Sequence, residues 1–233
     1  MLGAVVFLHG SGDTGGGIKS WIQSVSPTFL SSLESQGIKV VFPSAAARPY
    51  TMAGGSLSTV WHDRQYLSSD APEDAVGLSA SRAVISAVVS DLLSSDGLPA
   101  SAVVVGGFSM GGGTSLHACL QGGGGGDNGL NGVAGVFSMS SFVTSKSSLW
   151  IDLATRTTLN PTQPTPPVFM THGSHDSMIG VRWATETADR LKQTGLTQVD
   201  FYEEPYLDHE PGPQSLELLQ TWILAKIVKP TTP

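Results

Sequence analysis

Short apolar runs alternate with longer stretches of helical period along most of the chain. The runs are rich in β-branched residues and are bounded by glycine or polar residues, as expected of buried parallel strands. The predicted strands are Ala4–Leu8, Ile38–Phe42, Ala102–Val105, Val133–Ser138, Val168–Thr171 and Gln198–Tyr202. The pattern also predicts helices over Ile18–Ser35, Pro72–Ser95, Gly111–Leu120, Val181–Gln193 and Pro213–Val228.

The helical period is clearest in the last of these segments, whose apolar stripe consists of Leu216, Leu219, Ile223 and Ile227. Regular alternation of strands and helices predicts an α/β fold, in which a mostly parallel central sheet carries helices on both faces. In such a sheet, functional residues gather beyond the carboxyl ends of the strands. Candidate chemistry is therefore sought at those ends.

Two segments depart from the alternation. Pro43–Asp70 is long and contains Trp61 with several Gly and Pro residues, so a long loop near the candidate site is predicted there. Residues 121–131 include five consecutive glycines and are predicted to form a flexible surface linker. No insertion is long enough for a large cap, and the length fits a single domain over residues 1–233.

Charge and cysteine content restrict the function classes. The net charge of −7 argues against nucleic acid and against an anionic membrane surface as partners. No apolar run reaches the length of about 18 residues that would predict stable membrane insertion. Cys119 is the only cysteine, and the opening residues lack the basic region of a signal peptide. A cytoplasmic protein is therefore expected.

The sequence G-F-S-M-G at 107–111 follows a predicted strand directly and precedes a predicted helix. In this context the central serine lies on a sharp turn that exposes its hydroxyl as a nucleophile. Ser109 is therefore the candidate nucleophile. A serine between glycines is by itself more often an ordinary turn residue, so the interpretation depends on partners elsewhere in the chain.

Two polar clusters follow later strands. H-G-S-H-D at 172–176 follows Val168–Thr171, and Y-L-D-H-E at 206–210 follows Gln198–Tyr202. They supply Asp176 as candidate acid and His209 as candidate base, in the order nucleophile, acid, base. A histidine base can take the serine proton and later give it to the leaving group, while the aspartate holds the imidazole in place.

Other polar residues near these positions have alternative interpretations. His175 follows the wrong strand to be the base, and Asp208 adjoins the base in sequence and would point away from it. His9 and His172 are interpreted as structural, and Cys119 as a packed core thiol. His62 stays ambiguous.

A serine nucleophile also needs donors for the negative oxygen of its tetrahedral intermediate. One expected donor is the backbone N–H of Met110, at the start of the helix after the nucleophile. The other is the backbone N–H of Ser11, in the H-G-S-G segment after the first strand.

Three motifs that would imply a cofactor or metal fail on inspection. G-S-G-D-T-G at 10–15 resembles a dinucleotide fingerprint, but no acidic residue follows the next strand, which ends at Phe42. Residues 12–20 resemble a phosphate-binding loop whose lysine is out of register. His172, His175 and Asp176 form a minor candidate metal site. We therefore predict no cofactor and no metal.

Taken together, these motifs resemble the acyl-protein thioesterase/lysophospholipase family. The resemblance rests on F-L-H-G-S-G-D-T-G at 7–15, V-W-H-D-R at 60–64, G-G-F-S-M-G-G at 106–112, H-G-S-H-D at 172–176 and H-E at 209–210. It implies a single-domain α/β-hydrolase fold, no cofactor, and a cytosolic enzyme that hydrolyses acyl esters or S-acylated proteins. It also implies a catalytic triad of Ser109, Asp176 and His209, with Ser11 and Met110 as oxyanion donors.

The chain departs from the family pattern at Met110, where most acyl-protein thioesterases have glutamine; the backbone donor is unaffected. The five-glycine segment is an addition, and residues that usually form an upstream edge hairpin are not present. Two further functions compete with the thioesterase: a small-molecule carboxylesterase and a catalytically idle fold used for binding. Trp61 is a candidate substrate-binding residue that could equally anchor its loop, and short or medium acyl groups are favoured over palmitoyl.

Overall fold

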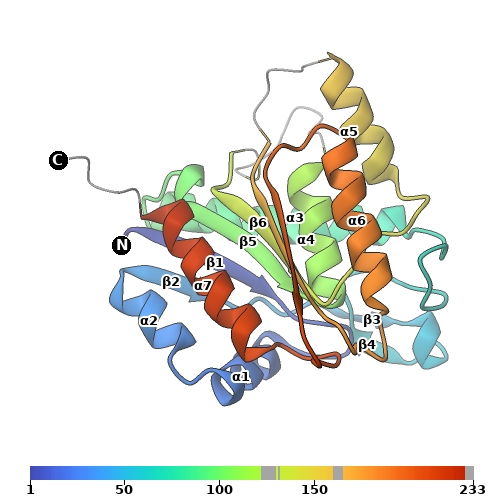
Figure 1. Cartoon of the computed structure of the whole chain (residues 1–233), viewed down its shortest axis with the longest axis horizontal. Coiled ribbons are helices and arrows are strands. Elements are labelled where there is room, and N and C mark those ends of the chain that lie inside the picture. The colour runs from blue at the N-terminus through green and yellow to red at the C-terminus, as the bar shows by residue number, and fades with distance from the viewer. Residues whose placement is uncertain (122–129, 131, 160–164, 229–233) are drawn as a thin grey trace.

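A computed structural model describes residues 1–121, 130, 132–159 and 165–228 of the chain. In this part of the chain, six strands form one sheet in the order β2-β1-β5-β6-β7-β8, and every neighbouring pair is parallel (Figure 1). The strands are β1 (Gly3–Leu8), β2 (Ile38–Val41), β5 (Val103–Phe108), β6 (Gly135–Met139), β7 (Val168–Gly173) and β8 (Val199–Glu204). Each predicted strand is found within a few residues of its expected bounds.

Helices cover both faces of the sheet, and alternate residues of β1 supply both cores. Val5 and Phe7 face a cluster with helices α1 (Gly15–Val25), α2 (Phe29–Ser35) and α7 (Pro213–Ile227). Val6 and Leu8 face the other cluster, with α3 (Ala75–Ser95), α4 (Met110–Leu120), α5 (Ser148–Leu159) and α6 (Val181–Gln193). The predicted three-layer α/β fold in a single domain is thus confirmed (Figure 1).

The predicted helix Ile18–Ser35 was wrong as one element, because the structure contains two helices, α1 and α2. Pro27 lies between them, and a proline disfavours helical backbone in the residue before it. That residue, Ser26, is extended with φ −135° and ends α1. The start of α1 also lies earlier than predicted, because the Thr14 hydroxyl accepts the Gly17 N–H at 3.0 Å and caps the helix.

Helix α3 begins at Ala75 rather than at Pro72. Asp74 is its N-cap, and the Asp74 carboxylate accepts the Gly77 N–H at 2.9 Å. Among the described helices, α3 is the one that is long and apolar enough to cross a membrane by length and composition. Its Ile85 and Val89 side chains are fully buried in the core of the protein.

Helix α5 was missed in the sequence. Its sequence is rich in threonine, which has a low helix propensity. The hydroxyls of Thr155 and Thr158 donate to carbonyls four residues earlier, so they are satisfied within the helix. Leu149 and Leu153 are buried and attach α5 to the core.

Segment Pro43–Asp70 is not a loop throughout. It contains an antiparallel hairpin of β3 (Ala47–Pro49) and β4 (Leu57–Thr59), with one short helical turn, η1 (Thr51–Ala53), between them. A second such turn, η2 (Ala100–Ala102), precedes β5. The Gly12 N–H donates to the Thr59 carbonyl at 2.9 Å, so the hairpin is tied to the loop after β1. Most of the predicted linker 121–131 lies outside the described residues.

Candidate active site

Ser109 occupies the turn between β5 and α4, with φ 53° and ψ −124°. A non-glycine residue rarely adopts a positive φ, so this backbone is strained. The turn is held because the Ser109 N–H donates to the Met139 carbonyl at 2.8 Å. A Cβ on Gly107 or on Gly111 would lie 2.5 Å from the Leu8 carbonyl oxygen. Both positions therefore require glycine for β5 and α4 to approach β1 this closely.

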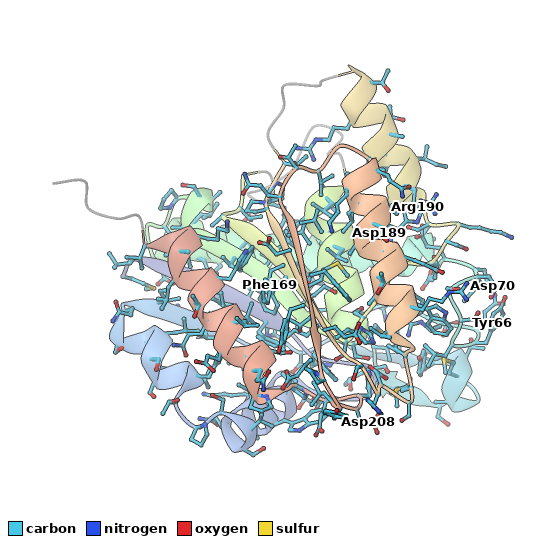
Figure 2. All side chains as sticks on the ribbon, viewed as in Figure 1. Tyr66, Asp70, Phe169, Asp189, Arg190 and Asp208 are labelled. Atoms are coloured by element: carbon cyan, nitrogen blue, oxygen red, sulfur yellow. The ribbon has the colours of Figure 1, made fainter. Side chains whose placement is uncertain are left out.

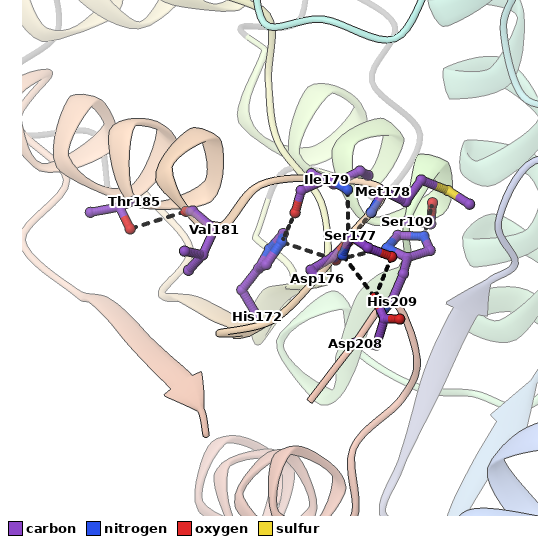
Figure 3. A network of polar contacts seen from close by, with 10 residues as sticks. All are labelled: Ser109, His172, Asp176, Ser177, Met178, Ile179, Val181, Thr185, Asp208 and His209. Atoms are coloured by element: carbon purple, nitrogen blue, oxygen red, sulfur yellow. Dashed lines mark hydrogen bonds and ion pairs between the residues drawn. The ribbon is translucent and has the colours of Figure 1, made fainter. Parts of the chain in front are cut away.

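His209 connects Ser109 to Asp176 (Figure 3). Its Nε2 lies 3.0 Å from the Ser109 Oγ, and its Nδ1 lies 2.8 Å from the Asp176 Oδ2. The imidazole packs against the Phe108 ring, with centroids 4.9 Å apart. The structure therefore brings together the three residues that the sequence predicted as nucleophile, base and acid, at hydrogen-bonding distances and from three different strand ends.

The Asp176 side chain is fully buried and surrounded by donors. Its Oδ1 accepts the N–H groups of Met178 at 3.0 Å and Ile179 at 2.7 Å. Burial raises the pKa of Asp176, but hydrogen bonds from His172, His209 and the Ile179 N–H outweigh it and hold the pKa well below its ordinary value. At neutral pH, Asp176 is a carboxylate that accepts hydrogen bonds at both oxygens.

The two residues rejected from the sequence as acid and base, Asp208 and His175, do not take part in the side-chain contacts among Ser109, His209 and Asp176. The Asp208 Oδ1 accepts the Ser177 N–H and hydroxyl and the His209 backbone N–H, and these bonds lower the pKa of Asp208. The Asp208 carboxylate thus holds the loop, at the carboxyl edge of the sheet (Figure 2). His175 is exposed, and its ring lies 5.4 Å from that of Tyr206.

The two segments that carry the expected oxyanion donors, the loop after β1 and the start of α4, both lie beside Ser109. Met110 is the first residue of α4, so its N–H has no partner within that helix. A Cβ on Gly10 would lie 3.2 Å from the Ser109 Cβ, which places the loop after β1 against the nucleophile. His9 shapes this loop: its Nδ1 contacts the Gly10 carbonyl at 2.6 Å, and its Nε2 accepts the Ala45 N–H at 2.9 Å. Burial lowers the pKa of His9, as this neutral tautomer requires.

Trp61 is placed in the core, where it anchors its loop. The side chain is 1% exposed, so it does not form the wall of an open groove, and the substrate-binding interpretation needs correction. The indole N–H donates to the His9 carbonyl at 2.9 Å. The Ser81 hydroxyl donates to the Trp61 carbonyl. Because a buried indole N–H needs an acceptor, Trp61 fixes the position of the loop after β1.

A hollow lies along α4 on the side of α3. Gly113, one helical turn after the nucleophile, is part of its lining, and its N–H contacts the Ser109 carbonyl at 3.4 Å. The Arg64 guanidinium lies in the lining 5.3 Å from the centre of the Phe142 ring. Both apolar and polar side chains line this hollow, including Leu78, Val143, Glu73, His62 and His117.

Of the two histidines of the hollow, His117 is buried and His62 is half-buried, and both are neutral. Burial, with the positive charge of Arg64, lowers the pKa of His62 to about 4. Burial also lowers the pKa of His117, although Glu73 lies 3.3 Å from its Nε2 and acts in the opposite direction. From the sequence, the role of His62 was ambiguous and His117 was not recognised as a candidate. In the part of the chain that the structure describes, no three His, Cys, Asp or Glu side chains gather as a metal site.

Comparison with known proteins places the chain in a family. The model of the Phospholipase/Carboxylesterase family matches residues 2–227. The chain belongs to this family. Lysophospholipase-like protein 1 of Mus musculus is 34% identical over 96% of the chain and 87% of its own length. Acyl-protein thioesterase 1 homolog 1 of Dictyostelium discoideum is 26% identical over 97% of the chain and 91% of its own length.

Among solved structures, acyl-protein thioesterase 2 of Zea mays superposes with a TM-score of 0.78 at 28% identity, covering 97% of this chain and 94% of its own. The predicted resemblance to the acyl-protein thioesterase/lysophospholipase family and the predicted α/β-hydrolase fold are confirmed. The family member described here is an enzyme, a hydrolase of the serine type.

Proposed function

We propose that this enzyme hydrolyses acyl esters or thioesters through a covalent acyl-enzyme on Ser109, with His209 as general base and Asp176 as the residue that orients it. The observation that carries the proposal is the position of the His209 ring, whose two nitrogens contact the Ser109 hydroxyl and the Asp176 carboxylate. This arrangement has the geometry required of a serine nucleophile and its base.

In the proposed reaction, His209 Nε2 takes the hydroxyl proton as the Ser109 Oγ attacks the acyl carbonyl carbon. The imidazolium then gives this proton to the leaving alcohol or thiol, and the acyl group remains on the serine. Water repeats the sequence in the second half-reaction, with the same nitrogen as base and then as acid. The Asp176 carboxylate stays ionised throughout and stabilises the imidazolium.

We assign stabilisation of the negative oxygen to the backbone N–H groups of Ser11 and Met110. The start of α4 supplies the second donor next to the nucleophile, and the close packing of Gly10 on Ser109 supports the first. Removal of one such donor typically costs about 3 kcal/mol of transition-state stabilisation. Backbone donors held by the fold need no rearrangement during the reaction.

Met110 provides a test of the backbone assignment. Its side chain is 1% exposed and lies in the core, so Met110→Gln buries an amide. We expect kcat to stay within about tenfold of wild type, while the free energy of unfolding in urea falls by about 1–3 kcal/mol. Met110→Leu, the matched control, keeps both the N–H and the apolar side chain. A loss of kcat beyond tenfold in both folded variants would mean that the methionine side chain itself shapes the site.

We further propose a preference for short or medium acyl groups. The hollow that begins one turn from Ser109 contains the Arg64 guanidinium and the imidazoles of His62 and His117, which an alkyl chain cannot hydrate or pair. While apolar contact lasts, each added CH₂ contributes about 0.8 kcal/mol to transition-state binding. In a series of aryl esters from two to sixteen carbons, kcat/KM is therefore expected to rise and then fall before the longest members.

Arg64→Leu is expected to move the optimum of this series to longer acyl chains, because a charged group is replaced by a shorter apolar one. The matched control is Arg182→Leu on the exposed face of α6, which should leave the optimum unchanged. A steady rise through sixteen carbons in wild type would contradict the preference for short groups. An unchanged optimum in Arg64→Leu would mean that the acyl chain does not enter the hollow.

The hydrolase proposal competes with two alternatives. A catalytically idle protein that uses the fold for binding would not react with a fluorophosphonate probe, whereas the proposed nucleophile should be labelled at Ser109. A small-molecule carboxylesterase would cleave a simple aryl ester and leave an S-acylated peptide intact. The thioesterase named among the relatives favours the peptide as a substrate. We further propose a cytoplasmic location, which the single cysteine supports, and no nucleic-acid partner, which the net charge of −7 supports.

A further inference from the structure

We propose that His172 is a positioning residue for this reaction, which holds and polarises the Asp176 carboxylate through the same oxygen that contacts His209. The inference rests on the proposed roles of Ser109, His209 and Asp176. From the sequence alone, His172 was interpreted only as a structural histidine. In the structure, His172 contacts Asp176, the residue that orients the proposed base.

The His172 side chain is fully buried in β7, four residues before Asp176. Its Nε2 lies 3.1 Å from the Asp176 Oδ2 and 2.7 Å from the Ile179 carbonyl oxygen (Figure 3). Both of these neighbours are acceptors, so the Nε2 carries a hydrogen that is shared between them. The Nδ1 is buried with no hydrogen-bond partner among the described residues, which fits an unprotonated nitrogen in the neutral ring.

This bond completes the set of donors around Asp176. The Oδ1 accepts two backbone N–H groups, and the Oδ2 accepts from His209 and from His172. A carboxylate has about four lone-pair sites, so each site has a donor and the group cannot rotate without losing one. The oxygen that faces His209 is the same oxygen that faces His172. The hydrogen bond from His172 therefore draws electron density away from the contact with His209.

Loss of this donor has a predictable direction. Without His172, the Oδ2 is left with His209 alone, so its negative charge attracts the His209 imidazolium more strongly. The proton affinity of His209 then rises, and the deprotonated base is available only at higher pH. The other titratable group that interacts with Asp176 is Asp208, whose carboxylate is held by Ser177 and by the His209 backbone N–H.

A purely structural role for His172 predicts a different result. The bond to the Ile179 carbonyl also closes the turn that carries Asp176, so any substitution could loosen that turn. A loosened turn would lower kcat, but it would leave the proton affinity of His209 unchanged or, by separating Asp176 from it, decrease it. The pH dependence therefore distinguishes positioning through Asp176 from support of the loop.

The experiment compares three substitutions. His172→Leu removes the donor, and His172→Asn keeps an amide that is too short to reach Asp176. His172→Gln can place its amide N–H near the position of the Nε2. We expect kcat/KM on an aryl ester to fall about tenfold to hundredfold in the Leu and Asn variants, the loss that follows removal of a hydrogen bond to a charged group. The acidic limb of the pH profile of kcat/KM should move to higher pH by about 0.5 pH unit or more in these two variants.

His172→Gln is expected to recover most of the activity and the wild-type pH profile. A reduced kcat/KM with an unmoved acidic limb in both Leu and Asn variants would overturn the proposal, as would a Gln variant that is folded by circular dichroism but no better than Asn. Should the Leu variant not fold, the Asn and Gln variants alone carry the comparison.

A second measurement does not depend on activity. In a Ser109→Ala background, the pKa of His209 is followed by NMR titration with and without His172→Asn. The pKa should be higher when His172 is replaced, and an equal or lower value would overturn the proposal. If the protein proved to have no hydrolase activity, the proposed function would fail while this titration still reported on the contact between His172 and Asp176.

Discussion

Replacement of Ser109 by alanine is expected to abolish hydrolysis while the fold is retained. The hydroxyl is the proposed nucleophile, and no water molecule can form the acyl-enzyme in its place. Loss of a triad member leaves only the catalysis supplied by binding and the oxyanion donors, so kcat should fall by a factor of about 10⁴ or more. The measurement is kcat on a short aryl ester, with folding followed by circular dichroism.

The matched control for this variant is Ser140→Ala. Ser140 is also a buried serine with a positive φ, 47°, and it follows β6 at the neighbouring strand end. Its substitution tests whether strain and burial at a strand end, rather than the nucleophile, account for a loss of activity. We expect Ser140→Ala to keep most of its kcat. A Ser109→Ala enzyme that retained more than a few per cent of wild-type kcat would disprove the assignment of the nucleophile.

His209→Ala is expected to be about as damaging as Ser109→Ala, and the double variant should be little slower than either single one. Loss of the nucleophile and loss of its base both prevent the same step, the attack of the serine on the acyl carbon. The two losses in kcat therefore do not multiply. The measurement is kcat for the three variants on the same ester, extended to long reaction times because the residual rates are low.

His175→Ala is the matched histidine control, because His175 is exposed and lies at a neighbouring strand end. Its effect on kcat should stay below about tenfold. A collapse of activity in His175→Ala would reassign the base, and a double variant that is far slower than both single variants would show that Ser109 and His209 do not act as a unit.

The sequence predicted the sheet well because its strands are buried on both faces and therefore appear as continuous apolar runs. The helices were less certain where local signals compete with periodicity. Pro27 interrupts an apolar pattern that continues on both sides. The threonines of α5 lower its helix propensity, so the helix is hard to predict even though tertiary packing stabilises it. The hairpin of β3 and β4 was not visible, because its strands of three residues each are too short for alternation to be recognised.

The candidate triad could be predicted because each member follows a strand, and parallel strands bring their carboxyl ends to one edge. Two contacts could not be predicted in the same way. Trp61 was ambiguous because a loop tryptophan gives no sign of whether its indole faces solvent or the core. The contact of His172 with Asp176 depends on how the turn after β7 folds back, and a histidine four residues before the candidate acid was the only signal.

The glycines that pack the Ser109 turn have a consequence for how the enzyme can be assayed. β5 and α4 can lie directly against the end of β1 only because positions 107 and 111 are glycines, and these segments are far apart in sequence. The strained backbone of the serine has no support until that long-range packing is complete. Reactivity of Ser109 is therefore a property of the assembled sheet, and a partly folded chain should not react with an active-site label. Covalent labelling of the purified protein would then count native molecules in a mixed population of folded and unfolded chains, for example during heating.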